Sequence, residues 1–179
     1  MKIEQLVERR EINPKPLPYA LDALEPVMSK ETMDLHYNIK TKNYFKKYNA
    51  TGNNRDYNGA YLHTIFFDNL RSPKNKNEPV GNSTLIHIEK HFKTFDKFKD
   101  RFSEKAMTLH EWGWCAALAD GKIITFEDHE LVKNIVLLID MFEHAYIRDY
   151  DSKEKYIDSF WKIVNWDTVD KRLLARYAF

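Results

Sequence analysis

The sequence Leu138-Ile139-Asp140-Met141-Phe142-Glu143-His144-Ala145-Tyr146 joins the end of an apolar run to two side chains that bind metal ions. The run begins at Ile135, and the carboxylate of Asp140 and the imidazole of His144 are four positions apart. Two ligands at the end of a buried segment predict a metal site within a core. The same spacing also fits a solvated helix face or a capped helix end, so other parts of the chain must decide between these interpretations.

The composition predicts one compact protein or two tightly packed halves. The chain has 179 residues, of which 43% are hydrophobic and 14% aromatic, enough for a core. The net charge of +1 gives no general case for nucleic acid or an acidic membrane as a partner. The single cysteine, Cys115, excludes an internal disulfide, and no apolar run has the length of a signal peptide or membrane span. We therefore expect a cytoplasmic protein, and the acids among residues 1–12 argue against a transit peptide.

The first half of the chain predicts an antiparallel pair of helices after a proline-rich lead-in. Ser29 is a good N-cap for a helix that runs to about Tyr48, and the Gly- and Asn-rich segment 49–54 predicts a turn. A second helix is expected over Tyr57–Leu70. His36 and Tyr44 in the first helix can point toward a common interior. His63 lies in the second helix.

The second half predicts a small sheet with helices around it. Residues 71–83 are the most loop-like stretch, so we place the domain boundary there, with residues 1–75 as lead-in and hairpin and 76–179 as the C-terminal domain. Apolar residues at spacings of three and four over 85–102 predict one or two amphipathic helices. The later segments are expected to be strands over 114–119, 122–126 and 135–140, with a tight Asp-Gly turn between the first two, and helices over 143–150 and 153–174. The predicted fold class is α+β, a helical hairpin followed by a three-stranded antiparallel sheet flanked by helices.

His87 and His91 form an i, i+4 pair of the kind found on zinc-binding helices. We predict that it is not a metal site, because no Glu follows His87 as in an HExxH motif. The flanking Glu89, Lys90 and Lys93 indicate a solvated face. His110 has no evident ligand partner, so we expect a surface or structural role for it.

The string DMFEHAY around Asp140 and His144, followed by FWKIVNWD at 160–167, resembles the C-terminal half of the iron/manganese superoxide dismutase family. The segments LPYALDALEP at 17–26 and TMDLH at 32–36, and then Tyr44, are similar to its N-terminal half. The matches occur in the family's order from Leu17 to about Leu174, so the chain is identified as a member of this family.

The resemblance implies a metal cage and the residues around it. His36, His63, Asp140 and His144 would hold one iron or manganese ion per subunit, with an open position for a small anion. The choice between iron and manganese stays open, and zinc fits less well because it does not change oxidation state. The resemblance further implies surrounding residues: the catalytic pair Tyr44 and His129, and the supporting residues Trp114 and Glu143. A register shift of one residue would put Asp128 or Glu130 in the place of His129.

The departures from the family pattern concern the dimer interface. Lys40 stands where the family usually has His, and Ile147 where it usually has the Tyr that pairs with that His across the dimer. Trp112 lies in a segment that is usually small and glycine-rich, whereas Glu143, which reaches the partner's ligand His in the family, is kept. We expect a homodimer with an altered interface.

The expected function is antioxidant: an oxidoreductase that disproportionates superoxide to dioxygen and hydrogen peroxide. Tyr44 and His129 would relay a proton, and Lys40, Lys42 or Lys153 could guide the anionic substrate. The alternative is a metal-binding homologue with little activity and a structural or interaction role. An unrelated helical non-haem iron protein would need more carboxylate ligands than Asp140 alone.

Overall fold

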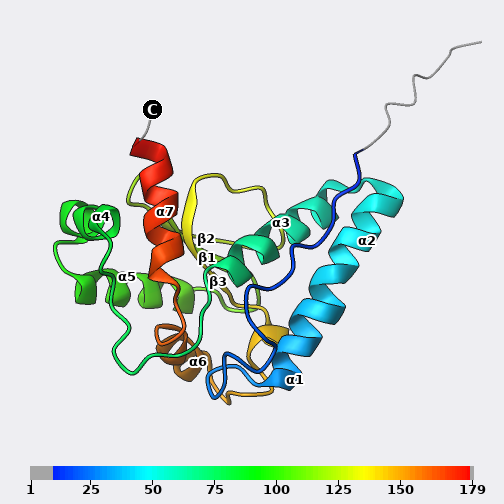
Figure 1. Ribbon diagram of the computed structural model, residues 1–179, viewed down its shortest axis with the longest axis horizontal. Helices are drawn as coiled ribbons and strands as arrows, with labels where there is room; N and C mark the ends of the chain where they lie inside the picture. Colours follow the sequence, from blue (N-terminus) through cyan, green and yellow to red (C-terminus); the bar gives the residue numbers. More distant parts are fainter. Residues whose placement is uncertain (1–9, 178–179) are drawn as a thin grey trace, which may run out of the picture.

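The protein is described by a computed structural model, which covers residues 10–177 (Figure 1). The first nine residues of the expected N-terminal domain therefore lie outside the described residues. The lead-in that follows has no helix or strand, as its prolines require. Within residues 10–177, no helix is both long and apolar enough to cross a membrane.

The helical hairpin is confirmed. Its first arm is a continuous helical run of α1 (Lys30–Met33), the π-helical segment η1 (Asp34–Thr41) and α2 (Lys42–Thr51), and its second arm is α3 (Asn54–Asp68). Ser29 is the N-cap, because its side chain accepts a hydrogen bond from the backbone N–H of Thr32 at 3.1 Å. Gly52 ends the first arm with φ 70°, a left-handed conformation that glycine adopts without strain. Asn53 then caps α3, which begins three residues earlier than expected.

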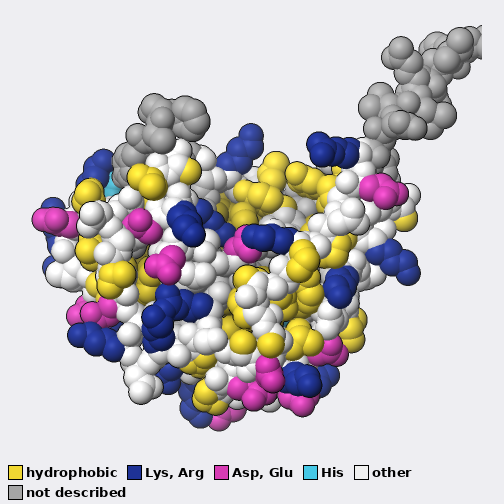
Figure 2. Space-filling view, in the orientation of Figure 1, with side chains coloured by type: hydrophobic (Ala, Val, Ile, Leu, Met, Phe, Trp, Pro, Cys, Tyr) yellow, Lys and Arg dark blue, Asp and Glu magenta, His cyan; other side chains and the backbone are white. Residues whose placement is uncertain are grey.

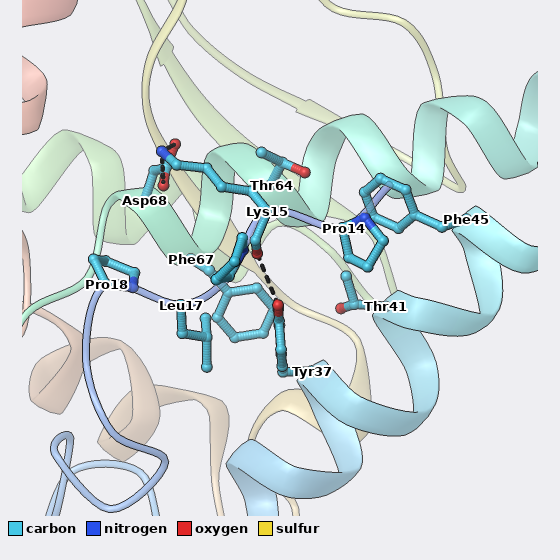
Figure 3. Close-up of a pocket in the computed structure, with 11 residues that line it drawn as sticks. Pro14, Lys15, Leu17, Pro18, Tyr37, Thr41, Phe45, Thr64, Phe67 and Asp68 are labelled. Atoms are coloured by element: carbon cyan, nitrogen blue, oxygen red, sulfur yellow. Dashed lines mark hydrogen bonds and ion pairs between the residues drawn. The ribbon is translucent and has the colours of Figure 1, made fainter. Parts of the chain in front are cut away.

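The lead-in packs against the hairpin (Figure 3). The Tyr37 hydroxyl donates to the backbone oxygen of Lys15 at 2.7 Å, and the Lys15 ammonium pairs with Asp68 at 2.9 Å. Pro14 and Leu17 line the same small cavity. These two contacts, one to each arm of the hairpin, hold the extended lead-in over both helical arms.

The C-terminal domain has the predicted three-stranded antiparallel sheet. Helices α4 (Asn82–Phe92) and α5 (Phe95–Met107) precede it, and its strands are β1 (Trp114–Leu118), β2 (Ile123–Phe126) and β3 (Ile135–Asp140) in the spatial order β2-β1-β3. Asp120 and Gly121 form the turn between β1 and β2, as expected. The register places Trp114 opposite Asp140, so an aromatic side chain lies beside the carboxylate at the end of β3.

Two helix predictions were wrong. The segment 143–150 contains only the 3-10 turn η2 (Glu143–Ala145), because Tyr146 has φ −145°, outside the helical range. The segment 153–174 is two helices, α6 (Lys153–Phe160) and α7 (Trp166–Tyr177). The backbone between them pairs with the segment after α3, where the backbone N–H of Arg71 donates to the oxygen of Ile163 at 2.8 Å. The backbone oxygen of Ile163 is therefore not available for the hydrogen bonds of one continuous helix.

The two halves pack against each other through α3 and β3 (Figure 1). The Asn69 side chain, just after α3, donates to the backbone oxygen of Leu138 in β3 at 2.9 Å. Phe66 and Trp114 are fully buried, one from each half, and their rings are in contact. The domain boundary at residue 75 stays a prediction, although residues 71–81 contain no helix or strand.

Candidate metal centre

Four potential metal ligands converge where the hairpin meets the sheet. His36 comes from η1, His63 from α3, Asp140 from the end of β3 and His144 from η2, and one ligand atom of each lies within 4.8 Å of the others. His36, His63 and Asp140 are fully buried, whereas the side chain of His144 is 17% exposed. The structure thus brings together the whole predicted ligand set.

The ligand atoms are spaced as a single ion requires. Asp140 Oδ2 lies 3.0 Å from His36 Nε2 and 3.6 Å from the Nε2 atoms of His63 and His144. Two ligand atoms about 2.1 Å from an ion and 90–120° apart would be separated by about 3.0–3.6 Å. None of the four atoms has a hydrogen-bond partner among the described residues. Buried polar atoms without partners are rare, so this cluster fits one bound metal ion.

Second contacts orient two of the ligands. His63 Nδ1 is 2.7 Å from the backbone oxygen of Gly59, so this nitrogen carries the proton and Nε2 presents its lone pair to the cluster. Asp140 Oδ1 accepts a hydrogen bond from the backbone N–H of Phe142 at 2.8 Å, which leaves Oδ2 for the ion. The backbone just after β3 therefore orients the Asp140 carboxylate.

Burial sets the charges of the ligands. It lowers the pKa of His36, against the opposing effect of Asp140, and lowers the pKa of His63 well below its ordinary value. Burial alone would raise the pKa of Asp140, but the imidazoles of His144 and His36 hold it below its usual range. At neutral pH the cage therefore offers neutral imidazoles at His36 and His63 and one negatively charged carboxylate. With a divalent or trivalent ion bound, the site as a whole would keep a net positive charge.

Tyr44, His129 and Trp114 form a hydrogen-bonded chain beside the cage. The Trp114 indole N–H donates to His129 Nδ1 at 3.2 Å, and His129 Nε2 lies 2.6 Å from the Tyr44 hydroxyl. Because an indole can only donate, His129 Nδ1 is the acceptor, so the neutral ring carries its proton on Nε2 and donates it to Tyr44. The rings of Tyr44 and His129 lie 5.2 and 5.7 Å from the ring of His63. A hydrogen bond between His129 and solvent bound at the metal ion stays a prediction.

The neighbours of His129 settle the question of register. Asp128 forms a two-pronged ion pair with Arg55, with Nη2 2.6 Å and Nε 2.8 Å from its two carboxylate oxygens. Asn58 donates to the backbone oxygen of His129 at 2.9 Å. Glu130 is exposed. His129 is therefore the residue of this segment that faces the cage.

Gly59 gives the Tyr44 ring its position. A Cβ atom at Gly59 would lie 2.7 Å from Tyr44 Cδ1, closer than side chains approach each other. The Tyr44 ring occupies the space that a side chain at residue 59 would fill. The absence of a side chain at residue 59 therefore allows the Tyr44 position from which its hydroxyl contacts His129.

Sequence reasoning missed two contacts around the site. One is the Arg55–Asp128 ion pair, whose partners are 73 positions apart. The other is Lys153, whose ammonium donates to the backbone oxygens of Leu109, His110 and Glu111 at 2.8–3.2 Å. No local pattern signals either contact, because each depends on how distant loops meet. Lys153 is thereby tied to the loop before β1.

The expected interface residues lie at the surface. Glu143 is exposed, and its carboxylate has no hydrogen-bond or ion-pair partner within residues 10–177. Trp112 is 50% and Ile147 59% exposed, and Lys40 is also exposed. The structure brings none of these into the cage, so their role at an interface stays a prediction.

The hairpin, the sheet and the ligand cluster define a mononuclear metalloprotein with an α-helical and an α+β part. Residues 13–56 match the family described as iron/manganese superoxide dismutases, alpha-hairpin domain, and residues 81–172 match the C-terminal domain of the same family. The chain belongs to the iron/manganese superoxide dismutase family, which is a family of oxidoreductases.

Curated relatives cover most of the chain. The superoxide dismutase [Fe] of Saccharolobus solfataricus is 33% identical over 88% of this chain and 91% of its own length. The superoxide dismutase [Mn/Fe] of Aeropyrum pernix is 33% identical over 88% of each chain. The superoxide dismutase [Mn] of Listeria monocytogenes is 31% identical over 89% of this chain and 96% of its own. The family predicted from the sequence is confirmed.

Proposed function

We propose that this protein disproportionates superoxide at one iron or manganese ion held by His36, His63, Asp140 and His144. The observation that carries the proposal is the set of four partnerless ligand atoms, which lie at the spacing of one coordination sphere. The relatives support the reaction because they are named superoxide dismutases, and their names include both metals.

A bound iron or manganese ion would supply the redox chemistry, taking one electron from a first superoxide to give dioxygen and passing it to a second, which becomes hydrogen peroxide with two protons. The protein must therefore deliver protons to the second oxygen species. Tyr44 is the proposed donor, supported by the packing of its ring beside His63 and by its hydroxyl, which accepts a hydrogen bond from His129 Nε2. Burial raises the pKa of Tyr44 to about 12, which keeps its own proton in place at neutral pH.

Attraction of the anionic substrate must be local. On the face in Figure 2, Lys and Arg side chains are interspersed with Asp and Glu, in keeping with the net charge of +1. Lys153 is engaged by three backbone oxygens, and Lys42 donates to the Asn38 side chain at 2.7 Å. Lys40, which is exposed and four residues after the ligand His36, is then the better candidate to guide superoxide.

We propose that the protein is a homodimer in which Glu143 reaches the partner's His144. Support comes from the exposed, partnerless carboxylate of Glu143 and from the partial exposure of the adjacent His144. Trp112 and Ile147 add exposed apolar surface, and its burial would stabilise the dimer. This apolar contact would replace the family's hydrogen bond across the dimer, which Lys40 and Ile147 cannot form. We further propose a reducing, cytoplasmic setting, with which the single free thiol of Cys115 is consistent.

The ligand set is tested by measuring metal content together with superoxide turnover in the variants His36→Ala, His63→Ala and His144→Ala. Each imidazole fills one coordination position from a different element, so each variant should lose stoichiometric metal and activity. His110→Ala removes an exposed imidazole elsewhere and should behave like the parent. Full metal occupancy with retained activity in any of the three ligand variants would overturn the cage.

A further inference from the structure

His87 and His91 lie together on α4, far from the cage. Their ring centroids are 4.7 Å apart, and α4 lies at the opposite edge of the molecule from the hairpin helix α2 (Figure 1). The flanking Glu89, Lys90 and Lys93 are exposed, as expected, but His87 itself is only 3% exposed. His91 is partly exposed, so the pair extends from the interior to the surface.

His87 has no hydrogen-bond partner. Neither of its ring nitrogens is bonded to any group within residues 10–177. A neutral imidazole has one donor and one lone pair, and leaving such a buried group unpaired costs about 1–3 kcal/mol. A buried polar group in this condition indicates something that the protein atoms do not supply, such as a water or an ion.

The surroundings of the pair limit what can be bound there. The turn between β1 and β2 closes over His91, because a side chain at Gly121 would overlap the His91 ring. Burial, His91 and Lys90 lower the pKa of His87 to about 4, while Asp120 acts in the opposite direction. His87 is therefore uncharged at neutral pH, with its lone pair available. Asp120, whose charge favours protonation of His87, pairs with Lys122.

We propose that His87 and His91, contrary to the expectation from the sequence, form a second metal site, which takes a borderline divalent transition ion such as zinc. Residues at i and i+4 share one helix face, so two imidazoles can bind the same ion, and imidazole is a preferred ligand of zinc, nickel and copper. Solvent would complete the coordination from the side of His91, which is partly exposed. The cage is the sole group of three or more His, Cys, Asp or Glu ligands within residues 10–177, so this second site is the weaker of the two.

Equilibrium dialysis of the iron- or manganese-loaded protein against zinc chloride tests the proposal, with both metals measured afterwards. The parent should retain the cage ion and bind one zinc per chain in addition. His91→Ala and His87→Leu should each lose that zinc while keeping the cage ion, whereas His110→Ala, which removes an exposed imidazole, should keep both. Zinc should also raise the unfolding temperature of the parent and leave that of His91→Ala unchanged.

His91 is partly exposed, so His91→Ala tests the site even if His87→Leu folds poorly. Failure of the parent to bind zinc beyond the cage ion would overturn the proposal and indicate that water alone satisfies His87. Unchanged zinc binding by His91→Ala would overturn it as well. Neither result bears on superoxide turnover, because the two sites share no residue.

Discussion

The Nε2 atom of His129 lies 2.6 Å from the hydroxyl of Tyr44, although the two residues are 85 positions apart in the chain. Tyr44 comes from the helical hairpin and His129 from the loop after β2, so the bond joins the two halves beside the metal cage. The indole of Trp114 fixes the direction of this bond by donating to the other nitrogen of His129. The hydroxyl proton of Tyr44 is therefore not used in this bond, in keeping with the proposed role of Tyr44 as a proton donor.

Tyr44→Phe should keep the metal and lower the rate of superoxide turnover, because the hydroxyl is proposed to donate a proton. General acid catalysis usually contributes at least about 100-fold, but solvent can partly replace the hydroxyl, so we expect a loss of about tenfold. His129→Ala should alter the redox potential and the pH profile of turnover. If the two residues act as one chain, the double variant should lose little more than Tyr44→Phe alone.

Tyr57→Phe is the matched control for that pair, because Tyr57 is a 37% exposed tyrosine of the same hairpin. It should leave turnover, potential and pH profile unchanged. Additive losses in the double variant, or parent-like behaviour of His129→Ala, would contradict the proposed chain and leave His129 as a turn residue.

Arg55→Met should lower turnover with little effect on stability. The Arg55–Asp128 pair is about half exposed on both sides, so it contributes less than about 1 kcal/mol to the free energy of unfolding. The pair nevertheless holds the loop that carries His129, so its loss should shift the pH profile of turnover toward that of His129→Ala. Arg71→Met is the control, since it breaks an ion pair with Asp167 away from the site. A parent-like pH profile in Arg55→Met would show that the pair does not position His129.

The free energy of unfolding of the metal-free protein should fall as the pH is lowered from about 6.5 toward 4, in part because of His87. Its pKa is lowered to about 4 in the folded protein, so the unfolded chain binds the proton first and is favoured in this range. Denaturant titrations at pH 7 and pH 5 should show a smaller decrease for His87→Leu than for the parent, by on the order of 1–2 kcal/mol. The free energy of unfolding of His110→Leu should decrease by as much as that of the parent. Equal decreases in all three proteins would contradict the low pKa of His87.

Glu143→Ala should weaken the dimer and the metal site together. A hydrogen bond to a charged group contributes about 1.5–3 kcal/mol, and a symmetric dimer has two, so its dissociation constant should rise by at least about 100-fold. Sedimentation velocity and metal analysis measure the two effects, with Glu89→Ala as an exposed control on α4. A fully active parent that is monomeric at micromolar concentration would exclude this role of Glu143.

The sequence predicted the hairpin and the sheet because their signals are local. Ser29 and Gly52 mark helix ends, and the apolar segment at Ile135–Asp140 is a strand with the expected bounds. The breaks near Tyr146 and Ile163 could not be predicted, because they arise from backbone geometry and from pairing with a segment 92 positions away. In such places tertiary contacts override the helical pattern.

The ligand set was accessible from the sequence only through the family pattern. Spacing alone leaves Asp140 and His144 as an ordinary helix pair, and nothing local distinguishes His36 and His63 from other buried histidines. His87 shows the opposite case, where charged neighbours indicated a solvated face although the side chain is buried. Burial of a single helix residue depends on what packs over it in the folded protein, and this is not encoded by its neighbours in the chain.

The central claim is superoxide disproportionation at the cage, and the direct measurement is superoxide decay after pulse radiolysis in the presence of the iron-loaded, manganese-loaded and metal-free protein. At least one loaded form should accelerate the decay catalytically, with many turnovers per ion, and metal removal or His63→Ala should abolish the acceleration. Decay at the uncatalysed rate with the cage fully loaded by either metal would contradict the account and leave a metal-binding homologue without this activity.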